Sequence, residues 1–415
     1  MRGDGVGQSQ TGTVRELLSG RWRVRYRTLD GRRTRVRCVT DRSGLVAVQA
    51  AFPILQSSAP DRDSWRTRVR RYPCPPLPYM EQSGAMRRPQ AIDLFAGAGG
   101  LSLGLHQAGI DVAAGFEWDA DACETFAKTH PTSDVIRADL NDVDFRAWRG
   151  IDLLVGGPPC QPWSTGGKRL GTDDVRDGWP TYLRALGEIR PTAFVAENVS
   201  GFATGIRRDH FGALLAAMEG LGFTVTAKVL NAADYGVPQK RQRVVIVGTR
   251  GCTFQFPGPQ FGPGRRRSWR TAGEVLTAKP VGIPNPSIVT YARNPDLRPN
   301  PYDGHLFNGG GRPIDLDQPV RTLLASMGGN KTPWIDVDRV VPGYHRHLSS
   351  GGGPRLGRVP GARRITVEEA AVLQSFPLGM YFAGPRSSCY RQIGNAVPPM
   401  LAAALGRALC KQVFA

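Results

Sequence analysis

AIDLFAGAGGLSLGL, residues 91–105, is the stretch that decides the fold class of this chain. Ala91–Phe95 is a short apolar run, a glycine-rich turn follows it, and Leu101–Ala108 has the apolar spacing of a helix. Glycines allow the backbone to approach a ligand closely, and the amino terminus of the helix faces that ligand. The stretch therefore predicts a strand, a ligand-binding turn and a helix.

The next two expected strands also end in acidic residues. Val112–Phe116 reads as a strand followed by Glu117, about 20 positions after the glycine turn. An acid at this distance hydrogen-bonds a ribose hydroxyl in dinucleotide-type folds. Trp118 offers an aromatic face for stacking on an adenine, with an ordinary half-buried tryptophan as the alternative. Asp139, after the apolar run Val135–Ala138, repeats the pattern.

The alternation of expected strands and helices continues to about residue 248, and the composition then changes. The apolar runs Ile151–Val155, Ala193–Ala196 and Val244–Val247 alternate with helical stretches. This alternation predicts an α/β fold with a doubly wound, mostly parallel sheet. Beyond Gly248 the chain is rich in Gly, Pro and Arg and shows little periodicity. Order returns at Thr366–Glu369, a capping box that opens a helix.

A cysteine between prolines follows one of these strands. Cys160 lies in GGPPCQPWS, residues 156–164, where Pro158 and Pro159 restrict the backbone. Ligands of open α/β sheets bind at the carboxyl ends of the strands, so a thiol held there reads as a nucleophile. Most free cysteines are small buried hydrophobes, and that alternative stays open on this residue alone.

Charge is distributed unevenly along the 415 residues, whose net charge is +19. Residues 1–88 contain 18 Arg, no Lys and 7 acids, and residues 251–362 contain 14 basic and 7 acidic residues. The rest is nearly neutral. Two basic segments around a neutral core favour a polyanionic partner such as nucleic acid, with a merely solvated charged face as the alternative.

Cysteine usage and hydropathy narrow the class of protein further. The seven cysteines are scattered and form no CxxC pair, which fits a reducing cytoplasm and argues against a disulfide framework or a zinc site. No apolar run is long enough to span a bilayer, and residues near Met1 do not resemble a signal peptide. Residues 1–85 have two interpretations, a basic extension that contacts DNA and a basic, poorly ordered leader, and the composition favours the second, although Val24–Val39 alternates enough for a hairpin. Translation can also begin at Met86.

Taken in order, these motifs resemble those of the DNA (cytosine-5) methyltransferases of the bacterial restriction-modification type. The resemblance covers roughly residues 91–415, with a variable gap at 251–362, and residues 1–85 have no counterpart in it. Its motifs here are DLFAGAGGLSLGL (93–105), FEWD (116–119), ADLND (138–142), GGPPCQPWS (156–164), ENV (197–199), QKRQRVVIVG (239–248), RRITVEEAAVLQSFP (363–377) and RQIGNAVPP (391–399).

The resemblance implies a chemical role for each of four residues. Cys160 would add covalently to C6 of a cytosine and so make C5 nucleophilic. Glu197 would contact N3 as a carboxyl able to donate a proton, and Arg243 would hold O2. Arg241 would support the ring or the loop. A structural salt bridge is the alternative for Glu197 and both arginines. The target base is expected to be flipped out of the duplex.

The implied methyl donor is S-adenosylmethionine, with S-adenosylhomocysteine as product and no metal. The residues expected to contact it are Phe95, Gly97, Gly99, Gly100, Glu117, Trp118, Asp139, Pro158, Asn395 and Val397. Because the last two lie near the end of the chain, the final segment is expected to return to the sheet.

These expectations divide the chain into four parts. After residues 1–85 we expect a catalytic and cofactor-binding domain over 86–250. A smaller, irregular target-recognition domain over 251–384 and a returning segment over 385–415 follow. Ser164–Arg176 is expected to be a mobile loop over DNA, Arg265–Arg267 to contact phosphates, and Gly328–Thr332 to enter a groove.

The predicted protein is a monomeric cytoplasmic enzyme that acts on double-stranded DNA and associates with the nucleoid when bound. It has no membrane partner, and a cognate restriction endonuclease is its expected functional partner. Two alternatives stay open, an RNA cytosine-5 methyltransferase and a non-catalytic DNA-binding relative. The basic segment at 251–362 favours DNA over RNA. The presence of Cys160, Glu197 and Arg243 together disfavours a non-catalytic relative.

Overall fold

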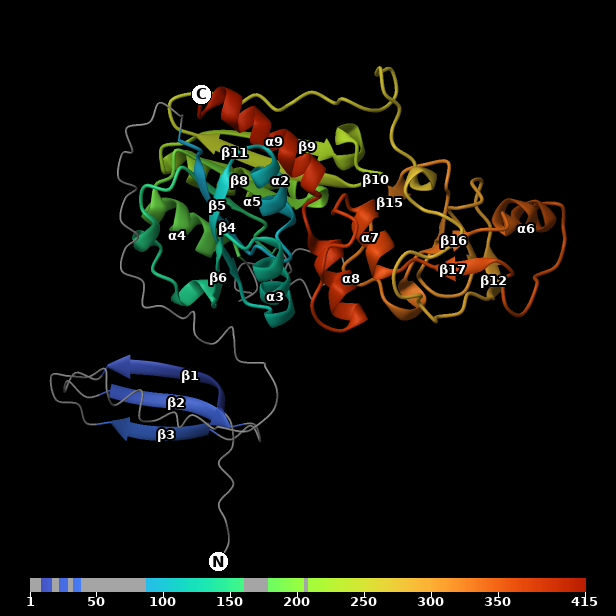
Figure 1. Cartoon of the computed structure of the whole chain (residues 1–415), viewed down its shortest axis with the longest axis horizontal. Helices are drawn as coiled ribbons and strands as arrows, with labels where there is room; N and C mark the ends of the chain where they lie inside the picture. The colour runs from blue at the N-terminus through green and yellow to red at the C-terminus, as the bar shows by residue number, and fades with distance from the viewer. Residues whose placement is uncertain (1–8, 17–21, 29–32, 39–86, 160–177, 205–207) are drawn as a thin grey trace, which may run out of the picture. The chain divides into compact units, whose positions relative to one another are not determined.

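The fold is seen in a computed structural model of the chain, which describes residues 9–16, 22–28, 33–38, 87–159, 178–204 and 208–415 (Figure 1). The chain divides into two compact units, Met1–Pro75 and Pro76–Ala415, called here the N-terminal unit and the main unit. Within the part of the chain that is described, no helix combines the length and apolar composition needed to cross a bilayer.

The N-terminal unit contains an antiparallel sheet of three strands in the order β1-β2-β3. These are β1 (Ser9–Glu16), β2 (Trp22–Thr28) and β3 (Arg33–Cys38). The hairpin expected from the alternation in Val24–Val39 is confirmed as β2 and β3. Residues 9–38 therefore include a paired sheet where the composition favoured a weakly organised extension.

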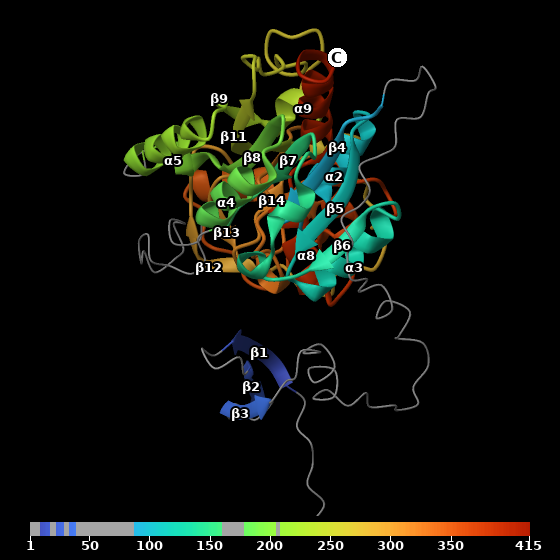
Figure 2. The same ribbon diagram turned by 90° about the vertical axis from the view of Figure 1, so that its left-hand side faces the viewer.

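The main unit is built on a sheet of seven strands in the order β6-β5-β4-β7-β8-β11-β9 (Figure 2). The first five strands in this order run parallel, whereas β11 is antiparallel to both of its neighbours, β8 and β9. The expected mostly parallel α/β sheet is confirmed. Its strands are β4 (Gln90–Leu94), β5 (Asp111–Glu117), β6 (Asp134–Arg137), β7 (Leu153–Gly156), β8 (Ala193–Val199), β9 (Thr224–Asn231) and β11 (Gln242–Thr249).

Helices cover both faces of this sheet, which makes it doubly wound (Figure 2). Alternate strand residues feed two separate cores: Ala91 and Leu153 pack with α2 and α9, and Ile92 and Leu154 pack with α4 and α5. Strands buried on both faces become continuous apolar runs, as their sequences show. The helices are α2 (Gly100–Gln107), α3 (Ala120–Thr129), α4 (Trp179–Ile189), α5 (Arg208–Gly220) and α9 (Pro399–Gln412).

The segment between β11 and α9 forms smaller sheets and short helices around two further cores. One strand pair, β10 with β15, joins it to the end of the large sheet. The expected capping box at Thr366 and Glu369 is confirmed at the start of α7. Strand β10 (Gln239–Lys240) precedes β11 in the chain. The elements of the segment itself are β12 (Tyr291–Asp296), β13 (His305–Phe307), β14 (Pro313–Ile314), β15 (Val320–Arg321), β16 (Trp334–Asp336), β17 (Ala362–Arg364), α6 (Val340–Ser349), α7 (Val367–Leu373) and α8 (Arg386–Asn395).

The end of the chain returns to the large sheet through α9, which packs on α2 (Figures 1 and 2). The approach is so close that a Cβ at Gly104 would lie 2.4 Å from the Cβ of Ala402 and from the carbonyl oxygen of Pro399. Glycine at this position therefore allows α9 to lie directly against the helix that follows the glycine turn.

Candidate active site

Three neighbouring strands bring the predicted site residues to one edge of the sheet. Strand β7 lies between β4 and β8, and all three run parallel. The glycine turn follows β4, the segment 157–159 follows β7, and Glu197 lies near the end of β8. Because parallel strands end at the same edge, these three segments form one surface, as expected of a ligand site in this fold class.

The glycine turn has a backbone that few residues other than glycine adopt. Gly97 and Gly99 have φ of +55° and +79°, and Phe95 has φ of +58° despite its side chain. A non-glycine residue at positive φ stores backbone strain, a feature found mainly at functional positions. A Cβ at Gly99 would lie 2.4 Å from Cε1 of His130, so this position also lacks room for a side chain.

Glu117 holds the turn through its carboxylate. Its Oε2 accepts a hydrogen bond from the Gly97 amide, and its Oε1 accepts from the amides of Trp118 and Asp119, each at 2.9 Å. Trp118 itself is 77% exposed, so its indole is available to a ligand and contributes little to the core. The structure thus joins the end of β5 to the turn after β4.

Asp139 lies beside this group at the end of β6. The Ala138 amide donates to the Glu117 carbonyl oxygen at 3.2 Å, which places the two acid-bearing strand ends side by side. Asp139 Oδ1 accepts from the Asn141 amide at 3.0 Å and so fixes its own loop. Three of the expected cofactor contacts, Glu117, Trp118 and Asp139, therefore share one corner of the sheet edge.

The end of the chain completes this corner. A Cβ at Gly100 would lie 2.4 Å from the Val397 carbonyl oxygen, so Val397 lies against the start of α2. Asn395 is exposed at the end of α8, two residues earlier. Residues almost 300 positions apart in the sequence are thus neighbours, as the expected return of the final segment requires.

The backbone at Pro158, directly after β7, is hydrogen-bonded to the end of β8. Asn198 Nδ2 donates to the Pro158 carbonyl oxygen at 2.9 Å. A Cβ at Gly157 would lie 3.6 Å from Glu197 Oε2, so the backbone after β7 passes directly beside this carboxylate. Glu197 itself is 8% exposed.

Cys160, the predicted nucleophile, lies outside the described residues, as does the expected loop Ser164–Arg176. The residues on either side of the gap are placed. The Gly178 amide donates to the Pro159 carbonyl oxygen at 3.0 Å, and a Cβ at Gly178 would lie 2.9 Å from Cζ of Phe95. Pro159 and Gly178, the residues on either side of the gap, therefore lie together beside the glycine turn.

Glu197 forms an ion pair with Arg243 on the adjacent strand β11. Arg243 Nε lies 2.9 Å from Glu197 Oε1, and the two side chains are only 12% and 10% exposed. The contact lacks the alignment of a hydrogen bond, and Arg243 Nη1 instead donates to the Gln242 carbonyl oxygen at 2.7 Å. The carboxylate and the guanidinium thus lie together at the site, and Glu197 Oε1 still has the capacity to accept a hydrogen bond.

Arg241 is held differently, although it is only two positions away. It is 1% exposed, and its guanidinium donates to the carbonyl oxygens of Leu323, Gly394 and Ala396 at 3.3, 2.9 and 3.1 Å. Burial, with a smaller effect of Arg243, lowers the pKa of Arg241 to about 9, so the side chain remains charged at neutral pH. These contacts correspond to support of a loop, the second of its two expected roles.

Replacing Arg241 is expected to destabilise the main unit. Arg241→Met removes the charge and leaves three backbone carbonyl oxygens without this donor, so the free energy of unfolding should fall by about 3 kcal/mol. Urea unfolding followed by tryptophan fluorescence measures the change. Arg146→Met, which removes an exposed ion pair with Asp144, is the control and should unfold like the wild type. Equal stability of Arg241→Met and the wild type would contradict the structural role.

Sequence reasoning missed two buried glutamines in the same junction. Gln239 Nε2 donates to Gln374 Oε1, while its Oε1 accepts from the Leu323 amide at 3.0 Å. Gln374 Nε2 in turn donates to the Ala396 carbonyl oxygen at 2.6 Å. Both side chains are fully buried, and buried amides require such partners. Both lie in the motifs QKRQRVVIVG and RRITVEEAAVLQSFP, and that placement is the signal that could have indicated them.

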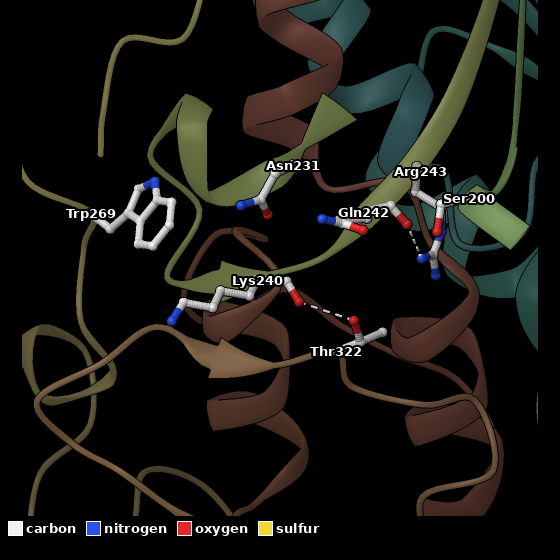
Figure 3. A pocket seen from close by; sticks show the side chains of 7 residues that line it. All are labelled: Ser200, Asn231, Lys240, Gln242, Arg243, Trp269 and Thr322. Carbon is white, nitrogen blue, oxygen red and sulfur yellow. Dashed lines mark hydrogen bonds between the residues drawn. The ribbon is translucent and has the colours of Figure 1, made fainter. Parts of the chain in front are cut away.

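A pocket of about 500 Å³ opens beside Arg243 (Figure 3). Lys240 Nζ lies 5.1 Å from the centroid of the Trp269 ring, and Thr322 Oγ1 donates to the Lys240 carbonyl oxygen at 3.0 Å. The pocket lies where β10 and β11 meet the segment that contains Trp269 and Thr322. Its lining residues are Ser200, Asn231, Lys240, Gln242, Arg243, Trp269 and Thr322.

The chain matches the family model of the C-5 cytosine-specific DNA methylases over residues 90–262 and 331–411. The unmatched stretch between these two blocks lies inside the irregular segment that follows β11. The N-terminal unit lies outside the match.

Two type II methyltransferases are similar to the chain over most of their length. M.PspPI of Psychrobacter sp. is 34% identical over 346 residues, which cover 78% of this chain and 79% of the relative. M.AplI of Arthrospira platensis is 33% identical over 330 residues, which cover 77% and 84%.

Solved structures share the fold. A putative DNA modification methyltransferase encoded in an Escherichia coli prophage aligns with a TM-score of 0.56 and 23% identity, covering 79% of this chain and all of that one. A DNMT2 variant from Spodoptera frugiperda aligns with a TM-score of 0.58 and 15% identity, covering 77% and 99%. At these identities the likeness shows the architecture alone.

Proposed function

Because this chain belongs to the C-5 cytosine-specific DNA methylase family, we propose that its sheet edge performs methyl transfer to cytosine C5 through Cys160, Glu197 and Arg243. The chain is a DNA cytosine methyltransferase, and its family and fold imply S-adenosylmethionine as the methyl donor. The Glu197–Arg243 pair carries the assignment of residues. It lies beside the backbone that leads to Cys160 and at the same edge as the glycine turn.

The Cys160 thiolate is proposed to activate C5 of cytosine. Cytosine C5 is too weak a nucleophile to take an electrophilic methyl group unaided. Addition of the Cys160 thiolate to C6 pushes electron density onto C5, and loss of the C5 proton later expels the thiolate. Two prolines precede Cys160 and limit the conformations of its backbone. The target base reaches this site only when it is flipped out of the duplex.

Glu197 and Arg243 are proposed to meet the charge that the addition creates on the ring. A carboxyl group that donates a proton to N3 neutralises the developing negative charge, and a guanidinium at O2 provides fixed donors. Arg243 has an unaligned contact with Glu197, so neither group has to break a strong mutual hydrogen bond to engage a base. Arg241 is proposed to act through the backbone segments it holds and not on the ring.

The residues at the glycine corner fit the methyl donor in chemical character. Bound S-adenosylmethionine supplies an electrophilic methyl group. We assign its ribose to Glu117, its adenine to Trp118 and Asp139, and the glycine turn, Pro158, Asn395 and Val397 to the walls of the pocket. The exposed indole of Trp118 is what an adenine-stacking residue requires, and Gly97 leaves open space where a Cβ would lie. The assigned chemistry requires no metal ion.

Glu117→Ala should weaken binding of S-adenosylmethionine by roughly 10- to 100-fold, because hydrogen bonds to a charged group contribute about 1.5–3 kcal/mol. The substitution also frees the amides of Gly97, Trp118 and Asp119, which the carboxylate holds. Isothermal calorimetry measures the change in Kd. Asp142→Ala, which removes an exposed acid after β6, is the charge-matched control. Unchanged affinity of the Glu117 variant would remove Glu117 from the cofactor site.

The irregular segment over residues 251–384 is proposed to be the target-recognition domain, with residues 86–250 and 385–415 forming the catalytic domain. Its own core around Trp334 and Tyr344 and its basic composition support this assignment. Arg265–Arg267 are proposed to contact phosphates. Within Gly328–Thr332, the exposed 3-10 helix Gly329–Lys331 is proposed to enter a groove, whereas Thr332 is buried. The pocket beside Arg243 provides Lys240 and Trp269 for the DNA strand next to the flipped base.

The proposal also covers the oligomeric state, the localisation and the functional partner of the protein. We propose that the protein works as a monomer in the cytoplasm, on nucleoid DNA and alongside a cognate endonuclease. The description of its relatives as type II methyltransferases supports the last of these. Bisulfite sequencing of DNA from cells that express the chain tests the function directly. Methylated cytosines in a recurring sequence are expected, and their absence would contradict DNA methylation in that setting. Parallel transfer assays on duplex DNA and RNA separate this function from RNA methylation.

A further inference from the structure

In the sheet of the N-terminal unit, the strand pairing places most arginines on one face and most apolar residues on the other. Pairing of β1 with β2 places Arg15 opposite Arg23, and pairing of β2 with β3 places Arg23 opposite Arg37. Residues paired directly across strands share a face of the sheet, and so do alternate residues along one strand. This face, called the arginine face, contains Thr11 and Thr13 and seven arginines, Arg15, Arg23, Arg25, Arg27, Arg33, Arg35 and Arg37.

The opposite face has the reverse composition. Its central row pairs Val14 with Val24 and Val24 with Val36. An adjacent row pairs Glu16 with Trp22 and Trp22 with Cys38, so Glu16 is the one acidic residue that the strand pairing places on this face. An antiparallel sheet with one apolar and one charged face packs the apolar face and leaves the charged face to solvent. Burial of several unpaired charges would cost far more than burial of these apolar residues. The register therefore separates seven arginines on one face from a largely apolar set on the other.

Arginines on the arginine face repel one another across the strands, and an anionic partner would reduce this repulsion. Arg23 opposes Arg37, Arg25 opposes Arg35 and Arg27 opposes Arg33. Like charges directly opposite each other destabilise a sheet, and no acid occurs among the residues of this face. Strands lie about 4.8 Å apart and alternate residues about 6.8 Å apart, so the face covers roughly 10 by 14 Å. A partner that presents regularly spaced negative charges over this area would remove the repulsion.

We propose that the arginine face binds the phosphate backbone of double-stranded DNA and gives the enzyme an additional, sequence-independent hold on its substrate. Guanidinium groups bind phosphate oxygens in a bidentate manner, and the first 88 residues contain 18 Arg but no Lys. DNA is the polyanion on which the family acts. The N-terminal unit lies outside the family match, so this binding face is an addition to the shared enzyme.

The test measures how binding of the full-length chain to a duplex of random sequence depends on salt. Each phosphate contact contributes about 0.9 to the slope of log Kobs against log salt concentration. The triple variant Arg23→Gln, Arg25→Gln, Arg35→Gln should therefore reduce the magnitude of the slope by about 2 to 3. Its affinity at 0.1 M salt should be at least about tenfold weaker. Fluorescence anisotropy with a labelled duplex measures both quantities.

Two further variants make the result specific. Arg66→Gln, Arg68→Gln, Arg70→Gln makes the same change in charge in the same N-terminal unit but outside the three strands, and should keep the wild-type slope. Replacing Arg23, Arg25 and Arg35 by Lys keeps the charge and should keep most of the slope. Loss of the slope in the Lys variant as well would show that the sheet, and not its charge, is responsible, and would overturn the proposal.

Other results would also overturn it. An unchanged slope in the Gln variant, or an equal loss in the control triple, would show that the arginine face is not a DNA site. Binding to anionic phosphatidylserine vesicles that depends on these arginines, with an unchanged DNA slope, would assign the face to a membrane surface instead. The kcat at saturating DNA should be the same in all variants, because catalysis is assigned to the main unit. A fall in kcat alone would question that assignment and not the arginine face.

Discussion

Cys160→Ser should abolish methyl transfer while leaving binding of DNA and cofactor intact. A hydroxyl is far harder to ionise than a thiol, so addition to C6 should fail, and kcat should fall by about 10³-fold or more. The glycine turn and the basic recognition segment do not depend on the thiol, so Kd for each ligand should stay near the wild-type value. Transfer of a labelled methyl group to DNA measures kcat, and calorimetry and anisotropy measure binding.

A duplex that contains 5-fluorocytosine at the target provides a second measurement of the same mechanism. Fluorine at C5 cannot leave as a proton does, so the wild type should remain covalently attached to the DNA through Cys160. The serine variant should form no such adduct, whereas Cys252→Ser, a change at a cysteine remote from the proposed site, should form it normally. Methylation by the wild type without trapping, or near-normal turnover of the serine variant, would show that the covalent mechanism is wrong for this protein.

Glu197→Gln is expected to lower kcat by about 10²- to 10⁴-fold, the range typical of a lost general acid. The amide keeps the size of the side chain but cannot deliver a proton to N3. Binding of S-adenosylmethionine should stay near the wild-type value, because Glu197 is assigned to the base and not to the cofactor. Steady-state transfer assays and calorimetry measure the two quantities. Glu219→Gln, at an exposed position on α5, is the matched control and should behave as the wild type.

A double-mutant cycle separates catalysis from the ion pair itself. If Glu197 and Arg243 serve only to hold β8 to β11, Glu197→Gln, Arg243→Gln and the double variant should lose stability without a selective loss of kcat. If both act on the ring, each single variant should lose kcat, and the losses should be non-additive, since the groups are 2.9 Å apart. Retention of most of the activity by Glu197→Gln, with a folded protein, would remove it from the mechanism.

The central elements could be predicted from the sequence because their signals are local. The apolar run Ala91–Phe95 corresponds to β4, and Val112–Phe116 corresponds to β5 with Glu117 at its end. A buried parallel strand needs a continuous apolar run, and a turn with positive φ needs glycine, so each appears directly in the residues. Strand β9 was missed because most of its residues are exposed or half-buried, which leaves no apolar run.

Pairing and polar partners could not be predicted, since they depend on residues far apart in the chain. Nothing in the sequence near Val244–Val247 indicates that β11 is antiparallel to both neighbours. Arg241 and Arg243 belong to the same short motif, yet one is buried against three carbonyl oxygens and the other faces Glu197. Which partner a charged residue meets is decided by the packing of segments such as Leu323 and Gly394.

The sequence by itself determined the fold class, the family, and the types of residue needed for the chemistry, because apolar periodicity, glycine turns and ordered motifs are properties of neighbouring residues. The tertiary structure decided three further points: that α9 packs directly on α2, that Glu197 of β8 lies beside Arg243 of β11, and that the arginines of β2 and β3 share one face of a sheet. Each of these depends on which distant segments pair, and the free energy of that choice is spread over the whole core.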